Sequence, residues 1–187
     1  KYEGKRRAEL LRNIEEVLLA MGMLKIPYMV VPLVDNGSID NPKQEFVLRE
    51  GLKKLYDVLL TNNVMMLFES DFSPKTLRQF IEVFDGKLFG INYDIGNSAS
   101  LGFEPREEIS AYGRWIKNVH VKDRNLGGGT VPLGEGNANL KLVCKLLHDN
   151  AYKGGFILQT ARASDERHVD TLCGYRDVLL NLLRNGR

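Results

Sequence analysis

Four residues with metal-ligating side chains lie at or near the ends of apolar stretches of the sequence: Glu69, Asp94, His120 and Gln159. Consecutive members are 25, 26 and 39 residues apart, about one strand and one helix each. The carboxyl ends of parallel strands share one edge of a sheet, so we expect these side chains to converge. Two carboxylates, an imidazole and an amide oxygen suit one divalent ion such as Mn²⁺, Mg²⁺, Co²⁺ or Zn²⁺. The pattern therefore predicts a metal site.

Each of these residues also has an ordinary structural explanation. A single acid at a strand end, such as Asp94, is often a helix N-cap or part of a loop salt bridge. A lone histidine in a strand, such as His120, is often a core residue that is hydrogen-bonded to its neighbours. Four candidates on successive strands weigh against coincidence. The stretch around Asp94, NYDIGNSASLG (residues 92–102), predicts a soft loop after the strand end that shapes a pocket above the metal, with Asn97 as a candidate for binding substrate.

The elements that would position these residues alternate along the chain. Short apolar runs predict buried strands at residues 26–34, 64–69, 88–94, 115–121 and 156–160. Amphipathic patterns predict helices over 6–21 and from 42 to about 59, after Ser73-Pro74, from residue 105, and over about 139–150 and 168–184. Strands separated by helices predict an α/β fold of parallel β-α-β units. Periodicity alone leaves open whether the sheet is doubly wound or part of a closed barrel.

Other polar residues follow the predicted strands. Asp35 and Asn36, in the segment DNGSI, are candidates for binding substrate, although Asn-Gly is also a common turn pair. Lys122 and Arg124 come directly behind His120 and are further candidates for the same role.

Two more features belong to the same predicted face. Asp123 could orient the imidazole of His120 from behind, or form a surface ion pair with a neighbouring lysine. The glycine-rich run at residues 125–136 offers backbone N–H groups to an anion, with Arg162 expected on the same side of the mouth as a residue that binds substrate. That run has neither phosphate-loop nor dinucleotide-binding spacing, so a flexible lid is the alternative.

Five segments, in order, resemble a known family: FES, NYDIGNSASLG, VHVKDR, VPLGEG and GGFILQTAR. They are similar to the xylose isomerase-like (AP endonuclease family 2) superfamily of TIM barrels. Within it they most resemble the sugar-phosphate isomerases and epimerases, such as hexulose-phosphate isomerases and pentulose-phosphate 3-epimerases. The resemblance runs over nearly the whole chain from about residue 26.

The resemblance implies a (β/α)₈ barrel with one divalent metal at the mouth, held by Glu69, Asp94 and His120. The fourth ligand position falls on Gln159, where the epimerases have a glutamate. Glu69 would be the general base that takes a proton next to a ketose carbonyl, giving an enediolate. Gln159 can coordinate and orient but cannot move a proton, which favours isomerisation along one face of the sugar over epimerisation.

By the same resemblance, the five strands correspond to the fourth to eighth of the barrel. The chain is therefore expected to be a single domain over residues 1–187 that lacks the first three β-α units. It would then be a fragment, a truncated product, or a protomer whose open edge a second copy covers as a homo-oligomer. A non-catalytic descendant is one alternative function, and a metal-dependent endonuclease of the same fold is another.

Composition sets the remaining expectations. The 187 residues are 43% hydrophobic and 27% charged, with a net charge of +2 and three histidines. The small number of histidines and the lack of a basic block argue against nucleic acid as a partner, and no apolar run suits a membrane. The partner that the resemblance implies is a small sugar or sugar phosphate. Cys144 and Cys173 both fall in predicted helices and suggest reduced core thiols of a cytoplasmic protein, with a disulfide between them as the alternative.

Overall fold

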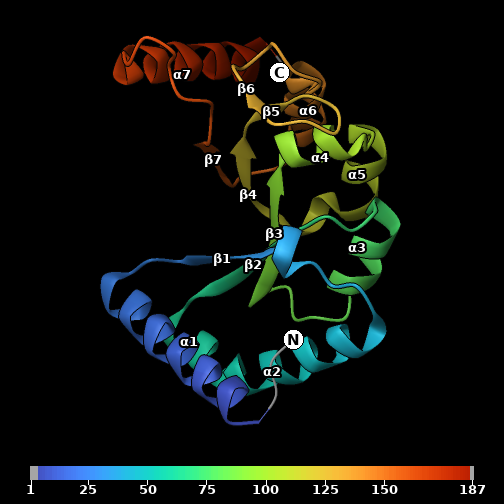
Figure 1. Ribbon diagram of the computed structural model, residues 1–187, viewed down its shortest axis with the longest axis vertical. Coiled ribbons are helices and arrows are strands. Elements are labelled where there is room, and N and C mark those ends of the chain that lie inside the picture. Colours follow the sequence, from blue (N-terminus) through green and yellow to red (C-terminus); the bar gives the residue numbers. More distant parts are fainter. Residues whose placement is uncertain (1–3, 186–187) are drawn as a thin grey trace. The chain divides into compact units, whose positions relative to one another are not determined.

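Five strands form a sheet in the order β1-β2-β3-β4-β7 (Figure 1). The structure is a computed structural model and describes residues 4–185. The strands are β1 (Tyr28–Leu33), β2 (Met65–Ser70), β3 (Phe89–Asp94), β4 (Ile116–Val121) and β7 (Gly155–Leu158). The pairs β1–β2, β3–β4 and β4–β7 are parallel, so the predicted α/β order is confirmed. Within the described residues the sheet is open, with β1 and β7 at its edges.

Helices separate the strands as the sequence predicts. They are α1 (Gly4–Leu24), α2 (Pro42–Asn62), α3 (Pro74–Ile81), α4 (Ile95–Leu101), α5 (Pro105–Tyr112), α6 (Leu140–Asp149) and α7 (His168–Asn185), with short 3₁₀ turns η1 (Asp35–Gly37) and η2 (Gly113–Trp115). The side chain of Asn41 caps α2 by accepting from the N–H of Gln44, and Ser73 caps α3 in the same way. No helix in the described part of the chain is long and apolar enough to cross a lipid bilayer.

Two segments differ from expectation. The soft loop predicted after β3 is wrong in its first part, because residues 95–101 form helix α4, which ends at Gly102 with a φ of +74°. These seven residues form a short helix because Asp94 caps the first turn of that helix. In the glycine-rich region, β5 (Asp123–Arg124) and β6 (Thr130–Val131) pair as a small antiparallel hairpin.

The chain divides into two compact units, of which the first comprises Lys1–Ser70 with Phe84–Gly90. In it, α1 and α2 lie beside each other and next to β1 and β2 (Figure 1). The ring of Phe68 stacks on that of Phe89 with centroids 6.0 Å apart, and Phe84 lies 5.0 Å from Phe89. These aromatic side chains continue a core that also contains Leu18, Leu52, Leu55, Leu59 and Met66.

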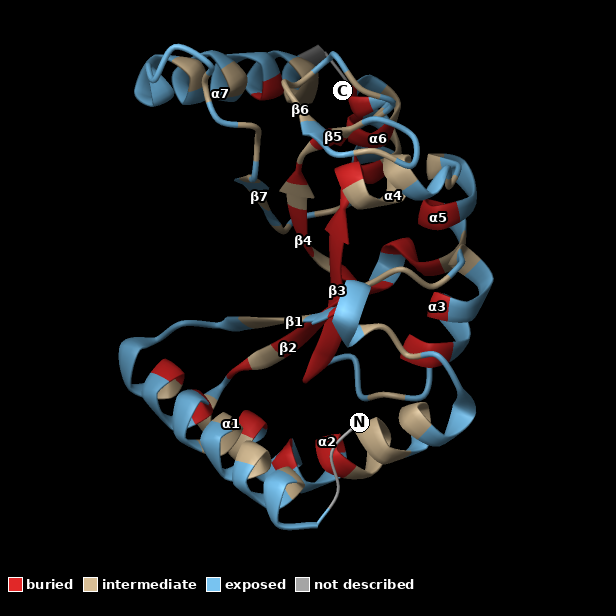
Figure 2. Cartoon of the chain, in the orientation of Figure 1, coloured by how far each residue is buried: buried red, intermediate tan, exposed pale blue. Residues whose placement is uncertain are grey.

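The second unit comprises Asp71–Val83 with Ile91–Arg187. Its core gathers apolar side chains of β3, β4, α5 and α6, among them Tyr93, Ile109, Tyr112, Val119, Val143 and Leu147. Figure 2 shows β3 buried along its whole length, as expected of a central strand. Trp115, in η2 just before β4, is also buried.

The two cysteines do not form a disulfide. Both are free thiols, and Cys144 is buried in α6. Burial raises the pKa of the Cys144 thiol to about 11. Cys173, in α7, is exposed, so the prediction of a second core thiol is wrong.

Candidate metal centre

Asp94 is the last residue of β3 and the N-cap of α4. One carboxylate oxygen, Oδ1, accepts a hydrogen bond of 2.8 Å from the backbone N–H of Asn97. The helix can begin so close to β4 because Gly96 has no side chain: a Cβ there would lie 2.7 Å from Cγ of Lys122. The capping role foreseen as an alternative is therefore confirmed. It occupies only one of the two oxygens.

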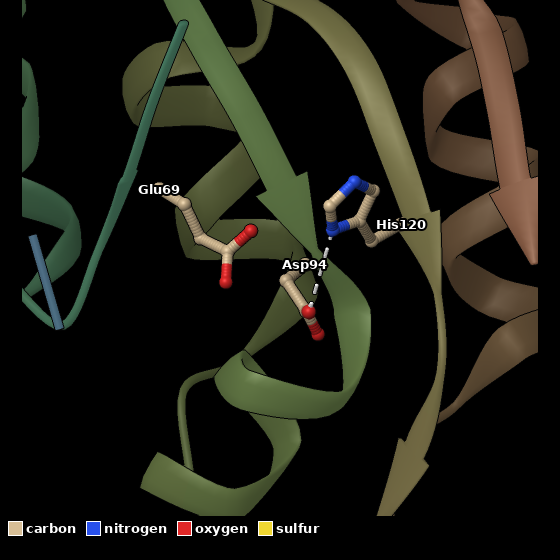
Figure 3. Close-up of side chains that lie close together, drawn as sticks. All are labelled: Glu69, Asp94 and His120. Atoms are coloured by element: carbon tan, nitrogen blue, oxygen red, sulfur yellow. Dashed lines mark ion pairs between the residues drawn. The ribbon is translucent and has the colours of Figure 1, made fainter. Parts of the chain in front are cut away.

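The other oxygen of Asp94 faces two side chains at the end of β4. Oδ2 lies 3.2 Å from Nζ of Lys122 and 3.8 Å from Nδ1 of His120, the pair marked in Figure 3. Burial alone would raise the pKa of Asp94, but the contact with His120, the N–H of Asn97 and the charge of Lys122 together hold it below its usual value. The carboxylate is therefore ionised, as a metal ligand must be.

An irregularity in the sheet places His120 opposite Asp94. The register of β3 and β4 shifts between Ile91 and Asn92, so that Asp94 pairs with His120. A buried hydrogen bond of 2.7 Å from Nδ2 of Asn118 to Oδ1 of Asn92 joins the two strands just beyond the shift. Bulges commonly re-aim side chains beside functional sites. This one aligns an acid and an imidazole that a regular ladder would offset by one residue.

Glu69, near the end of β2, is 8% exposed. Glu69, Asp94 and His120 form a group that could hold a metal ion, because each offers one ligand atom and these atoms lie within 4.8 Å of one another. Figure 3 shows the three side chains. Two carboxylates brought this close repel each other unless a cation offsets their charge. The donor set of two carboxylates and one imidazole fits a divalent ion that prefers oxygen and nitrogen ligands.

Gln159 and Arg162 come shortly after β7 in the sequence. The N–H of Gln159 donates to the carbonyl of Val121 over 3.0 Å, which extends the β4–β7 ladder by one step. Gln159 and Arg162 are both exposed. The role of Gln159 as a fourth ligand and that of Arg162 in binding substrate stay predictions.

Asp123 is fully buried, so the surface ion pair proposed as its alternative role is wrong. Its carboxylate accepts three backbone hydrogen bonds of 2.8–3.0 Å, from the N–H groups of Gly134, Gly136 and Ala138. It therefore fixes the far end of the glycine-rich segment, which argues against a freely flexible lid there. Whether Asp123 also orients His120 stays a prediction.

The remaining candidates for binding substrate lie in different surroundings. Arg124 donates to Oδ1 of Asn97 over 2.8 Å and to the carbonyl of Gly128, so it ties the β5–β6 hairpin to α4. Asp35 and Asn36 are exposed in η1, where Asp35 has a φ of +50°. The turn expected from DNGSI is thus present. The roles of these residues, and of Lys122, in binding substrate stay predictions.

Sequence reasoning missed one buried acid in the second unit. Glu108, in the first turn of α5, is 1% exposed. Its carboxylate accepts hydrogen bonds from the hydroxyl groups of Tyr93, Ser98 and Tyr112. Only Glu108 and Tyr112 are linked by helical spacing in the sequence, and the fold brings Tyr93 and Ser98 to them.

Comparison with known proteins adds the family. Residues 2–179 match the family described as "Xylose isomerase-like TIM barrel". The chain belongs to this family. The resemblance found from the sequence is confirmed, and the fold is of the TIM-barrel type rather than doubly wound.

Three proteins that are similar to this xylose isomerase-like chain show which activities and ligands occur among such proteins. An inosose dehydratase of Clostridium tetani (strain Massachusetts / E88) is 24% identical over 155 residues, 70% of this chain and 52% of the relative. The structure of an IOLI protein with a zinc atom has a TM-score of 0.83 at 14% identity, covering 100% of this chain and 73% of that one. A 3-keto-D-glucoside 4-epimerase of E. coli has a TM-score of 0.74 at 18% identity, covering 95% and 74%.

These likenesses to solved structures show a shared fold. The chain spans about half the length of the curated relatives it matches.

Proposed function

We propose that this chain carries the metal centre of a divalent-metal-dependent isomerase that acts on a ketose or sugar phosphate. The observation that supports this most is the group of Glu69, Asp94 and His120, whose ligand atoms lie within 4.8 Å of one another. Membership of the xylose isomerase-like family supports the sugar as substrate class. The zinc atom in the IOLI structure supports a divalent ion, whose identity in this chain is open among Mn²⁺, Mg²⁺, Co²⁺ and Zn²⁺.

Each residue then has a stated task. The bound ion would act as a Lewis acid on the carbonyl and the neighbouring hydroxyl of the sugar. Glu69, Asp94 and His120 would hold the ion, and Gln159 would complete the set through its amide oxygen. Glu69 takes the proton from the carbon next to the carbonyl and returns it to the neighbouring carbon on the same face. One base is enough for this transfer, whereas epimerisation needs a second proton donor that Gln159 cannot supply.

Charged and polar residues that follow the strands would hold the rest of the substrate. Lys122 and Arg124 follow β4, and Asn97 is fixed by Arg124. Arg162 would meet a phosphate or a distal hydroxyl, and Asp35 and Asn36 would bind hydroxyl groups. A guanidinium group suits a planar, doubly hydrogen-bonded contact with phosphate.

Dehydration is the second candidate, favoured by the match to inosose dehydratases. It shares its first step with isomerisation, the removal of a proton next to a carbonyl. It then differs, because a hydroxyl group on the next carbon leaves as water. Glu69 would be the base in both reactions.

The first test is metal binding. We expect Mn²⁺ to raise the thermal unfolding midpoint of the chain saturably, because a ligand at a hundredfold excess over Kd stabilises the folded state by about 2.7 kcal/mol. Asp94→Asn keeps an acceptor for the N–H of Asn97 but should abolish the rise. Asp149→Asn, which changes an exposed carboxylate on α6, is the matched control and should keep it. A chain that folds and shows no response to any of the four ions would refute the proposed centre and favour a non-catalytic barrel.

The second test is the reaction. With the bound ion identified, ketoses, their phosphates and inososes are incubated in deuterated water, and the products are identified by NMR. An aldose indicates isomerisation, an inverted ketose epimerisation, and a product lighter by one water dehydration. Glu69→Gln should lower the rate by at least a hundredfold. If that variant remained fully active, Glu69 would not be the base.

A further inference from the structure

Glu108 stands at the centre of a buried group of hydroxyl side chains in the second unit. Its Oε2 accepts from the hydroxyl of Tyr93 over 2.8 Å, and its Oε1 accepts from Ser98 over 2.7 Å and from Tyr112 over 2.5 Å. Burial is the largest cause that raises the pKa of each tyrosine well above its usual value, so both hydroxyls stay protonated and donate. One acid thus satisfies three donors that would otherwise be buried without an acceptor.

Two of the three donors flank Asp94 in the chain. Tyr93 is the residue before Asp94 in β3, and Ser98 lies four residues after it, in the helix that Asp94 caps. Glu108 therefore accepts hydrogen bonds from side chains on both sides of Asp94 in the chain, one in the strand and one in the helix. The third donor, Tyr112, sits on α5 with Glu108 itself, one turn further on, and has no such connection.

The element that carries Glu108 is itself fixed. Helix α5 begins at Pro105 and buries Ile109 and Tyr112 in the core of the unit. The hydroxyl of Tyr112 donates to the same carboxylate from within this helix. A displacement at Glu108 would pass to Asp94 through two short hydrogen bonds, each next to or within one helical turn of the ligand.

We propose that Glu108 is a positioning residue for Asp94: through Tyr93 and Ser98 it sets the direction in which the Asp94 carboxylate meets the metal. This inference rests on the proposed metal centre. The partners that orient metal ligands commonly govern affinity by about 10- to 100-fold, although they never touch the ion. A purely structural role would predict the same loss of stability for all three hydroxyls and no particular effect on the metal.

The three donors provide matched variants for the test. Tyr93→Phe, Ser98→Ala and Tyr112→Phe each remove one hydroxyl from the same carboxylate, and Glu108→Gln keeps the shape while it removes the charge. Isothermal titration with Mn²⁺ gives the Kd of each folded variant, and the unfolding midpoint without metal gives its stability. Both are measured on the full 187-residue chain.

We expect Tyr93→Phe, Ser98→Ala and Glu108→Gln to raise the Kd for Mn²⁺ by about tenfold. Tyr112→Phe should lower the unfolding midpoint comparably but change the Kd by less than about twofold, because it does not flank Asp94. Equal Kd values for the wild-type chain, Tyr93→Phe and Ser98→Ala would overturn the inference and leave the metal centre standing. A wild-type chain that binds no Mn²⁺ would overturn both.

Discussion

Two buried aspartates, one at the end of β3 and one just after β4, have different hydrogen-bond partners. Asp94 closes β3 and is 3% exposed, and Asp123 follows β4 and is 0% exposed. Asp123 accepts three hydrogen bonds, all from backbone N–H groups of residues 134–138. Asp94 accepts one backbone hydrogen bond, and its second oxygen faces the ammonium of Lys122 and the imidazole of His120.

The difference separates a structural acid from a candidate functional one. Backbone donors belong to the fold, and a ligand could replace them only by unfolding the loop that they fix. Side-chain partners can swing away and give their place to a cation. The same residue type at the same point of a β-α unit thus becomes an anchor or a binding group according to the donors that surround it.

The largest effect on stability is expected when the carboxylate of Asp123 is removed. Asp123→Ala removes the acceptor of three part-buried N–H groups, and we expect a loss of about 3–5 kcal/mol in the free energy of unfolding. Asp123→Asn keeps one acceptor oxygen and should lose about half as much. Urea unfolding followed by circular dichroism measures both. A loss below about 1 kcal/mol for Asp123→Ala would show that the loop has other supports.

The matching change at Asp94 should act on binding more than on folding. Asn is as good an N-cap as Asp, so Asp94→Asn should cost about 1–2 kcal/mol without metal, mostly from the ion pair with Lys122. At a hundredfold excess of Mn²⁺ over Kd it should also forgo the stabilisation of about 2.7 kcal/mol that the wild-type chain gains. If Asp123→Asn lost the metal response and Asp94→Asn kept it, the two roles would be exchanged.

A smaller effect concerns the cation that already neutralises Asp94. Lys122→Met keeps the aliphatic stem that packs over Gly96 but removes the ammonium 3.2 Å from Oδ2. Without this competing charge we expect Mn²⁺ to bind about fivefold more tightly, which corresponds to about 1 kcal/mol. Titration calorimetry at low salt measures the change. Unchanged or weaker binding would mean that the metal does not share the carboxylate with Lys122.

Local patterns in the sequence were sufficient to predict most of the fold. Asn41-Pro42 and Ser73-Pro74 mark the starts of α2 and α3, and apolar runs mark the strands, because capping and burial depend on neighbouring residues. Helix α4 escaped prediction because its small residues show no apolar face. It exists because Asp94 caps it and Gly96 lets it approach Lys122.

For the candidate metal centre, the sequence could predict which residue types lie at the strand ends, but not how their side chains meet. That Asp94 meets His120 depends on the register shift between Ile91 and Asn92, which no local pattern announces. The partners of Glu108 lie 4 to 15 residues away in the chain, and hydroxyl donors follow no period. The acid of a helix's first turn looks the same whether it is exposed to solvent or buried among tyrosines.

A third buried acid, Glu108, sharpens the comparison through its response to pH. Burial is the largest influence on Glu108 and raises its pKa above 4.5, against the neutral hydroxyl donors, with the charge of Glu104 adding to the rise. The folded state therefore binds the proton of Glu108 more tightly than the unfolded state. Its contribution to stability is fully present below about pH 4.5 and is lost as the pH rises through the folded-state pKa.

The measurement compares the wild-type chain with Glu108→Gln, which does not titrate at this position, by urea unfolding between pH 4 and pH 8. We expect the stability of the wild-type chain relative to the variant to fall as the pH rises above 4.5. Glu104→Gln should reduce that fall, because it removes a neighbouring negative charge. A wild-type chain that gained stability relative to Glu108→Gln over this range would mean that hydroxyl donors lower the pKa of a buried acid as effectively as Lys122 and His120 do at Asp94. The distinction between neutral and charged partners would then not explain the difference between these acids.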